Sequence, residues 1–197
     1  MTNWNLLRAA GIGAYLMLYL AVAWGLVATT SIVTKRISKV SSTLFHQFVA
    51  TTGLVLLGVH LALLLIDEFM PFAPLDLIVP LRSTYRPIPI SLGIAAMFAM
   101  VVIMVTSWLR KPIGVRLWRA IHLAAVPAFA LALGHGIFAG SDTNRPWMAA
   151  MYAVTGLSVV FLIIVRGLTY GYRPPRPERP VPARAVAAKD PEPASTS

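Results

Sequence analysis

Four histidines are the residues of this sequence best suited to bind a metal, and they form two pairs. His46 and His60 lie in one long apolar run, and His122 and His135 lie in another. Ionisable side chains inside membrane-spanning helices are costly and usually mark a functional site in the bundle interior. The alternative is that each imidazole only forms a hydrogen bond to a neighbouring helix. Two matched pairs make that alternative weaker than it would be for one histidine.

The spacing of the histidines predicts two levels along the bundle. His46 and His60 are 14 residues apart, so they point to nearly the same helix face and are separated axially by about 21 Å. Two spans further on, the chain runs in the same direction again, so His122 shares the level of His46. His135 then shares the level of His60. Two neutral imidazoles that face each other are what a bis-histidine haem iron needs.

A straight helix would misplace one histidine of the second run. The 13-residue spacing leaves His135 about 140° from His122 in helical phase. Pro127 lies between them, and a proline there removes the hydrogen bond to the carbonyl of Leu123. We therefore predict a kink or a change of phase in this helix.

Glycines near the histidines are expected to leave flat room for a haem. Gly53 and Gly58 flank the space between the ligands of the first run, and Gly134 and Gly136 bracket His135. Small residues are common at helix interfaces in membranes anyway, so these glycines add modest weight.

The composition excludes several other kinds of site. The sequence has no cysteine, which excludes disulfides, thiolate-bound zinc or iron–sulfur clusters, and haem attached through C-x-x-C-H. Metal transport or hydrolysis would require carboxylates within the spans, and no Asp or Glu lies within a predicted span. The Gly11-Ile12-Gly13 segment opens a span and indicates helix packing rather than nucleotide binding. We therefore expect no NAD or flavin site in this chain.

The elements that position the histidines are predicted to be membrane helices. Of 197 residues, 57% are hydrophobic and 12% are charged, against about 45–50% and 25% in soluble domains. Five charge-free runs each reach the roughly 20 residues that cross a bilayer as a helix. They cover residues 9–34, 40–66, 87–109, 120–141 and 146–165. We predict an all-α membrane protein, a five-helix transmembrane bundle over residues 1–170; cleavage of the first run as a signal peptide is the alternative.

The distribution of the cations predicts the orientation of the bundle. The formal net charge is +10, and 13 of the 17 Lys and Arg residues fall on one side of the predicted spans. The positive-inside rule then places the N-terminus outside and the C-terminus inside a cytoplasmic membrane. The charge is thus a topology signal, and no nucleic-acid partner is expected. The outer loop at 67–86 should fold back as a short cap, and the Pro-, Arg- and Ala-rich residues 171–197 should form a disordered cytoplasmic tail, either solubilising or in contact with lipid.

The histidine pairs and their surroundings resemble a known family. The pattern His46-x13-His60 is followed by Leu117-Trp118-Arg119-Ala120-Ile121-His122 and then by Gly134-His135-Gly136. It resembles the ferric reductase-like transmembrane domain of ferric reductases, NADPH oxidases and the haem-binding subunit of the bacterial methionine sulfoxide reductase system. The resemblance covers roughly residues 8–168. The cytochrome b of quinol oxidoreductases has a similar spacing, but the Trp118–His122 region favours the first family.

The resemblance implies two non-covalent haem b groups, one in each leaflet. It assigns His46 and His122 to the inner haem as axial ligands, and His60 and His135 to the outer haem. It further implies electron transfer from a cytoplasmic-side donor to an outer acceptor, either a protein or a small oxidant. Most reductases and oxidases of the family append a flavin domain, whereas here we expect a separate flavoprotein or quinone as donor to this oxidoreductase subunit.

Cations near each level are candidates for contacts with haem propionates, although plain topology explains each of them equally well. The inner candidates are Arg36, Lys39, Arg116 and Arg119, and the outer candidates are Arg82, Arg86 and Arg145. Tyr85 and Arg86 are also candidates to shape the acceptor site. Two further functions stay open: a quinone-linked membrane oxidoreductase subunit, and a haem-free structural or assembly protein whose histidines only bridge helices.

Overall fold

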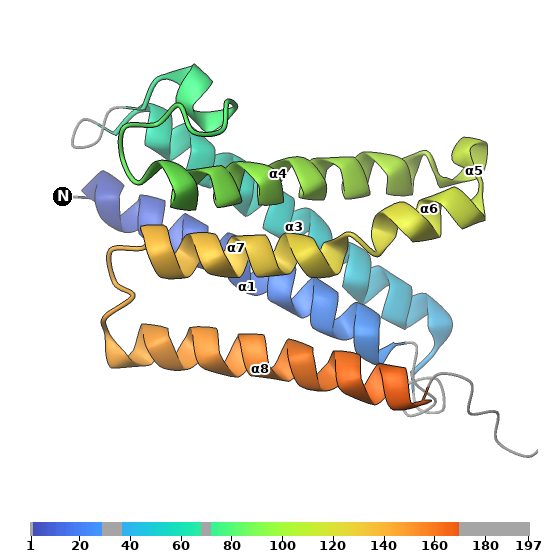
Figure 1. Cartoon of the computed structure of the whole chain (residues 1–197). Helices are drawn as coiled ribbons and strands as arrows, with labels where there is room; N and C mark the ends of the chain where they lie inside the picture. Colours follow the sequence, from blue (N-terminus) through green and yellow to red (C-terminus); the bar gives the residue numbers. More distant parts are fainter. Residues whose placement is uncertain (1, 29–36, 68–71, 170–197) are drawn as a thin grey trace, which may run out of the picture.

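The computed structural model describes residues 2–28, 37–67 and 72–169, and these form helices and turns without a strand. Five helical spans are long and apolar enough to cross a membrane, which confirms the predicted all-α fold of a multi-pass membrane protein (Figure 1). The spans are α1 (Thr2–Val27), α3 (Lys39–Leu65), α4 (Pro87–Trp108), the continuous pair α6 (Val115–His122) and α7 (Ala125–Ala139), and α8 (Pro146–Thr169). The predicted tail at 171–197 lies outside the described residues.

The first helix begins seven residues earlier than its charge-free run. α1 starts at Thr2 and includes Arg8, which forms an ion pair with the buried carboxylate of Asp142. A charged residue is tolerated in an apolar helix when an opposite charge faces it, so Arg8 does not mark the helix start. The last residues of the predicted run, 29–34, lie outside the described residues.

The helices pack mainly as two antiparallel pairs, α1 with α3 and α4 with α7. Each pair therefore joins one helix that carries histidines to one that carries none. α8 packs against α1 and α7, on the side of the bundle opposite α4 (Figure 1). Between α1, α7 and α8 lies a buried cluster that contains Tyr15, Leu18, Val22, Phe129, Tyr152 and Val159.

Polar contacts add specificity to this apolar packing. The Tyr15 hydroxyl bonds to the Thr155 hydroxyl, and Ser158 donates to the Tyr19 hydroxyl at 3.0 Å. In lipid the hydrophobic effect provides little driving force for helices to associate, so such interhelical hydrogen bonds help to determine which helices pack together. They connect α1 to α8 along two successive turns.

The fourth span is interrupted between its two histidines, as predicted. α6 ends at His122 and α7 begins at Ala125. Pro127 has no N–H for the Leu123 carbonyl, which instead accepts from Val126 N at 3.3 Å, while Ala124 N donates to Ile121 O at 2.9 Å. These shorter-range bonds overwind the chain locally, and this change of phase brings both histidines toward α3.

The described part of the loop between α3 and α4 folds against the helices, in agreement with the expected cap. Phe72 and Leu77 are buried, and a short 3-10 helix, η1 (Pro74–Leu77), lies at this end of the bundle. Asp76 accepts from the backbone N–H of Ala73 at 3.0 Å and from Arg82 Nε at 3.1 Å. These contacts give the described part of the loop a defined conformation close to the start of α4.

Candidate functional site

The structure brings together both of the histidine pairs that the spacing predicts. His46 of α3 and His122 of α6 have ring centroids 5.9 Å apart with an interplanar angle of 58°. His60 of α3 and His135 of α7 are close enough to interact electrostatically. All four side chains are half-buried. The inner pair is therefore in ring contact, whereas His60 and His135 are within electrostatic range of each other; the role of all four imidazoles as haem ligands stays a prediction.

Each imidazole of the outer pair is hydrogen-bonded to a neighbouring helix. His60 Nδ1 lies 3.0 Å from the carbonyl oxygen of Leu7 in α1, and His135 Nδ1 lies 2.9 Å from that of Pro89 in α4. A carbonyl oxygen only accepts hydrogen bonds, so Nδ1 must carry the proton in both rings. Nε2 then keeps its lone pair, and the ring has the tautomer and orientation typical of a metal ligand.

The inner pair lacks these bonds. The Nδ1 atoms of His46 and His122 are buried without a hydrogen-bond partner among the described residues. The Trp118 ring lies 5.1 Å from the His122 ring, and its Nε1 donates to Ser107 Oγ of α4 at 3.2 Å. His122 is thus held by ring packing rather than by a backbone hydrogen bond.

This donor set fits a bis-histidine haem. No group of three or more His, Asp or Glu side chains converges within the described part of the chain. These residues therefore provide no site that would bind a metal ion through three protein side chains. A haem needs only two, because the porphyrin itself supplies four nitrogens to the iron. Each level offers two imidazoles. In the pair His60 and His135, Nδ1 is protonated and bonded to a backbone carbonyl, so the lone pair of Nε2 is free to bind the iron. The residues present therefore suit one haem at each level.

The glycines that we expected to make room for haem mostly serve helix packing. A Cβ added at Gly53 would lie 3.0 Å from Met17 Cβ, and one at Gly134 would lie 3.2 Å from Leu92 Cδ1. Gly136 faces Tyr152, and Gly58 has no such neighbour within 4 Å. The expectation is corrected at Gly53, Gly134 and Gly136, because these positions face side chains of other helices, whereas the space at Gly58 is open and room for a haem there stays a prediction.

Two other glycines lie against imidazoles, and the sequence did not connect either of them with a histidine, since Gly11 was interpreted only as a helix-packing residue. Gly11 of α1 lies against the His60 ring, and Gly93 of α4 lies against the His135 ring. One signal was available for the first: Gly11 and Gly25 are 14 residues apart, as are His46 and His60. Two antiparallel helices with equal spacings place each glycine near one histidine.

The predicted propionate contacts differ in their surroundings. Arg116 and Arg119 are exposed on α6, Lys39 is exposed at the start of α3, and Arg36 lies outside the described residues. The outer candidates already have protein partners: Arg82 pairs with Asp76, Arg145 pairs with Asp142, and Arg86 donates to the carbonyl oxygen of Phe138 at 2.6 Å. Contact of any of these residues with a propionate stays a prediction.

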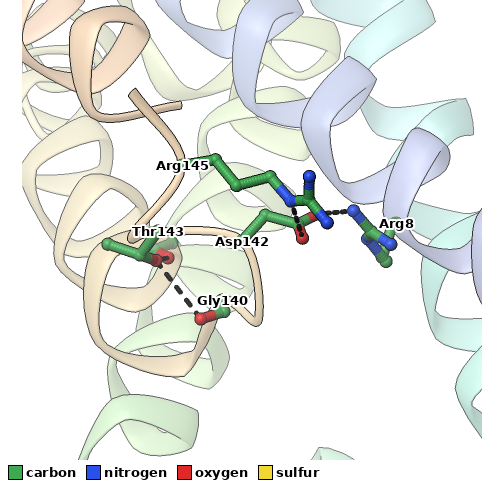
Figure 2. A network of polar contacts seen from close by, with 6 residues as sticks. Arg8, Gly140, Asp142, Thr143 and Arg145 are labelled. Atoms are coloured by element: carbon green, nitrogen blue, oxygen red, sulfur yellow. Dashed lines mark hydrogen bonds and ion pairs between the residues drawn. The ribbon is translucent and has the colours of Figure 1, made fainter. Parts of the chain in front are cut away.

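A buried carboxylate organises the end of the bundle nearest to His60 and His135. Asp142, in the turn after α7, pairs with Arg8 of α1 and accepts from Arg145 Nε at 3.2 Å (Figure 2). Thr143 Oγ1 in the same turn donates to the carbonyl of Gly140 at 3.2 Å. The Arg8–Asp142 pair connects α1 to the turn between α7 and α8, and the other two contacts hold the turn itself.

Comparison with protein families agrees with this geometry. The family model for the ferric reductase like transmembrane component matches residues 10–133, which is more than half of the chain. The match includes His46, His60 and His122, and it ends two residues before His135. No curated protein and no solved structure matches the chain. The chain therefore belongs to the ferric reductase-like transmembrane family.

Proposed function

We propose that this protein is a di-haem b electron carrier that passes electrons across the membrane, from a cytoplasmic-side donor to an acceptor outside. The observation that carries the proposal is the pairing of four histidines at two levels, His46 with His122 and His60 with His135. Membership of the ferric reductase-like family supports a role in membrane electron transfer. The bound haem iron would supply one-electron redox chemistry.

The histidines would occupy both axial positions at each level. With both positions filled, a small molecule has no open site at the metal, which favours electron transfer over ligand binding. His46 and His60 are 14 residues apart on α3, an axial separation of about 21 Å. In a hydrocarbon core of about 30 Å, that separation puts one pair in each leaflet.

The orientation and the partners are part of the same proposal. The excess of cations on one side of the spans supports a chain with its N-terminus outside and the His46–His122 level toward the cytoplasm. A separate flavoprotein or quinol would donate electrons at that level, and a protein or small oxidant would accept them near His60 and His135. Arg116 and Arg119, exposed within two turns of His122, are the propionate contacts that we propose for the inner haem.

Electron transfer across vesicles tests the proposal. The purified protein is reconstituted into liposomes that enclose ferricyanide, and dithionite is added outside as a membrane-impermeant reductant. We expect enclosed ferricyanide to be reduced with the wild type and with a Gly167→Ala control, because a Cβ at Gly167 meets nothing within 4 Å. His60→Leu or His122→Leu should abolish the transfer.

Ferricyanide consumption by either histidine variant at the wild-type rate would refute the two-level path. Absence of haem from the wild type would refute the whole proposal and favour a structural role. Rapid reduction of the haems by quinol, without any flavoprotein, would identify quinol as the donor.

A further inference from the structure

Both outer histidines contact a neighbouring helix at the same two-residue feature. It consists of a backbone carbonyl that accepts from the imidazole and a glycine four residues later. His60 bonds to the carbonyl of Leu7, and a Cβ added at Gly11 would lie 3.0 Å from its Nδ1. His135 bonds to the carbonyl of Pro89, and a Cβ added at Gly93 would lie 2.7 Å from its Nδ1. We name each combination a carbonyl–glycine seat.

Helix geometry explains why the glycine is needed. The carbonyl of residue i already accepts from the N–H of residue i+4, and the side chain of residue i+4 lies over that carbonyl. Glycine has no Cβ, so a ring from another helix can approach and form a second hydrogen bond to the same oxygen. An alanine at Gly93 would push against Nδ1 of His135, the atom that forms the bond.

The same feature is present but incomplete at His46. Ala21 and Gly25 occupy the corresponding places on α1, each 14 residues after Leu7 and Gly11. The Ala21 backbone is close enough to be a weak hydrogen-bond partner of the His46 ring, but the contact falls outside ordinary hydrogen-bond geometry, which leaves Nδ1 without a partner by that measure. A Cβ added at Gly25 would lie 3.7 Å from His46 Cε1, an ordinary contact. The ring is therefore farther from α1 here.

At His122 the feature is absent among the described residues. The His122 ring lies beside the Trp118 ring, with the two ring centroids 5.1 Å apart. Its Nδ1 is buried and has no hydrogen-bond partner among the described residues.

We propose that Gly11 and Gly93 are positioning residues of the outer haem site, which fix the tautomer and orientation of its two ligands, whereas the inner ligands are held more loosely. This inference rests on the proposed di-haem function. Replacement of outer-shell partners of metal-ligating histidines typically lowers affinity for the metal by about 10–100-fold. We expect the same loss at the outer haem alone. Its reduction potential should also rise, because an imidazole without its Nδ1 hydrogen bond donates less electron density to the iron.

The test compares four alanine variants of the full chain. Gly11→Ala and Gly93→Ala should weaken the outer haem and shift its potential and its EPR signal. Gly13→Ala is the matched control for helix packing, since its Cβ would lie equally close, at 3.0 Å, to Leu56 instead of a histidine. Gly25→Ala is the control for the looser inner contact. Both controls should keep both haems at wild-type potentials, and retention of the inner haem reports that Gly11→Ala and Gly93→Ala still fold.

Loss of the outer haem in Gly13→Ala, or equal effects of Gly11→Ala and Gly25→Ala, would overturn the inference and leave the di-haem proposal intact. A wild type that binds no haem would refute the proposed function instead. In that case 15N NMR of the imidazoles still tests the seats: two of the four rings should be fixed as the Nδ1-protonated tautomer, and Gly11→Ala should release one. If all four imidazoles gave equivalent signals, each exchanging between its two tautomers, the carbonyl–glycine seats would be refuted.

Discussion

Arg86 Nη1 donates to the carbonyl oxygen of Phe138 at 2.6 Å, which joins the start of α4 to the end of α7. Three residues further along α4, the Pro89 carbonyl accepts from His135, which lies three residues before Phe138. The two bonds follow one antiparallel register. The outer histidine of α7 is therefore bracketed by contacts to α4, and one of them uses a cation that the sequence suggested for a haem propionate.

Replacing Arg86 tests whether it mainly stabilises the α4–α7 contact or binds a haem propionate. Arg86→Met removes the bond to Phe138, and we expect a loss of about 1 kcal/mol in stability, as for a typical hydrogen bond. Thermal unfolding in detergent measures it, and Arg86→Lys should lose less because it keeps a donor. An unchanged melting temperature combined with a shifted potential of the outer haem would assign Arg86 to a propionate instead.

The buried carboxylate of Asp142 gives a second prediction. Asp142→Asn leaves Arg8 without its counter-charge at a site where the carboxyl side chain is only 8% exposed, and we expect a loss of about 1–3 kcal/mol. Arg145→Met should cost much less, because the Arg145 side chain is 66% exposed and surface pairs contribute little. Melting temperatures of the two variants check this order, and a larger loss in Arg145→Met would contradict it.

Pro127 tests the interruption of the fourth span. Pro127→Ala restores an N–H that can bond to the Leu123 carbonyl, so α6 and α7 can merge into one straight helix. His122 would then turn about 140° away from His135. We expect the inner haem to be lost or weakened and the outer haem to be retained, because the α7–α4 contacts of His135 are unaffected. Spectra that show both haems unchanged would mean that the proline does not set the phase.

The hydrogen bond between Tyr15 and Thr155 is expected to contribute to stability without affecting the haem sites. Tyr15→Phe removes this link between α1 and α8 and should cost about 0.6–1 kcal/mol, as other hydrogen bonds between membrane helices do. The four histidines lie on α3, α6 and α7, so both haem spectra should stay unchanged. Heat-inactivation curves and spectra of one preparation provide the comparison, and loss of a haem would show that α8 docking supports the site.

The sequence alone predicted the spans and the two histidine levels. Charge-free runs place most helix ends within a few residues because burying a charge in lipid is costly. Arg8 lies inside α1 with a partner 134 residues away, and Arg116 and Arg119 lie exposed inside α6, so both spans begin before their runs. Pro127 signalled the break because its effect is local. The carbonyl–glycine seats were missed because they depend on the register between helices. That register is fixed by packing, and only the repeated 14-residue spacing of Gly11 and Gly25 hints at it.

The haem content of single-histidine variants tests the central claim most directly. Pyridine haemochromogen assays of the purified wild type should give two haem b per chain. His60→Leu and His135→Leu should each retain one haem with the same spectrum and potential, and His46→Leu and His122→Leu should each retain the other. A wild type with no haem, or variants whose losses do not group as His46 with His122 and His60 with His135, would contradict the account.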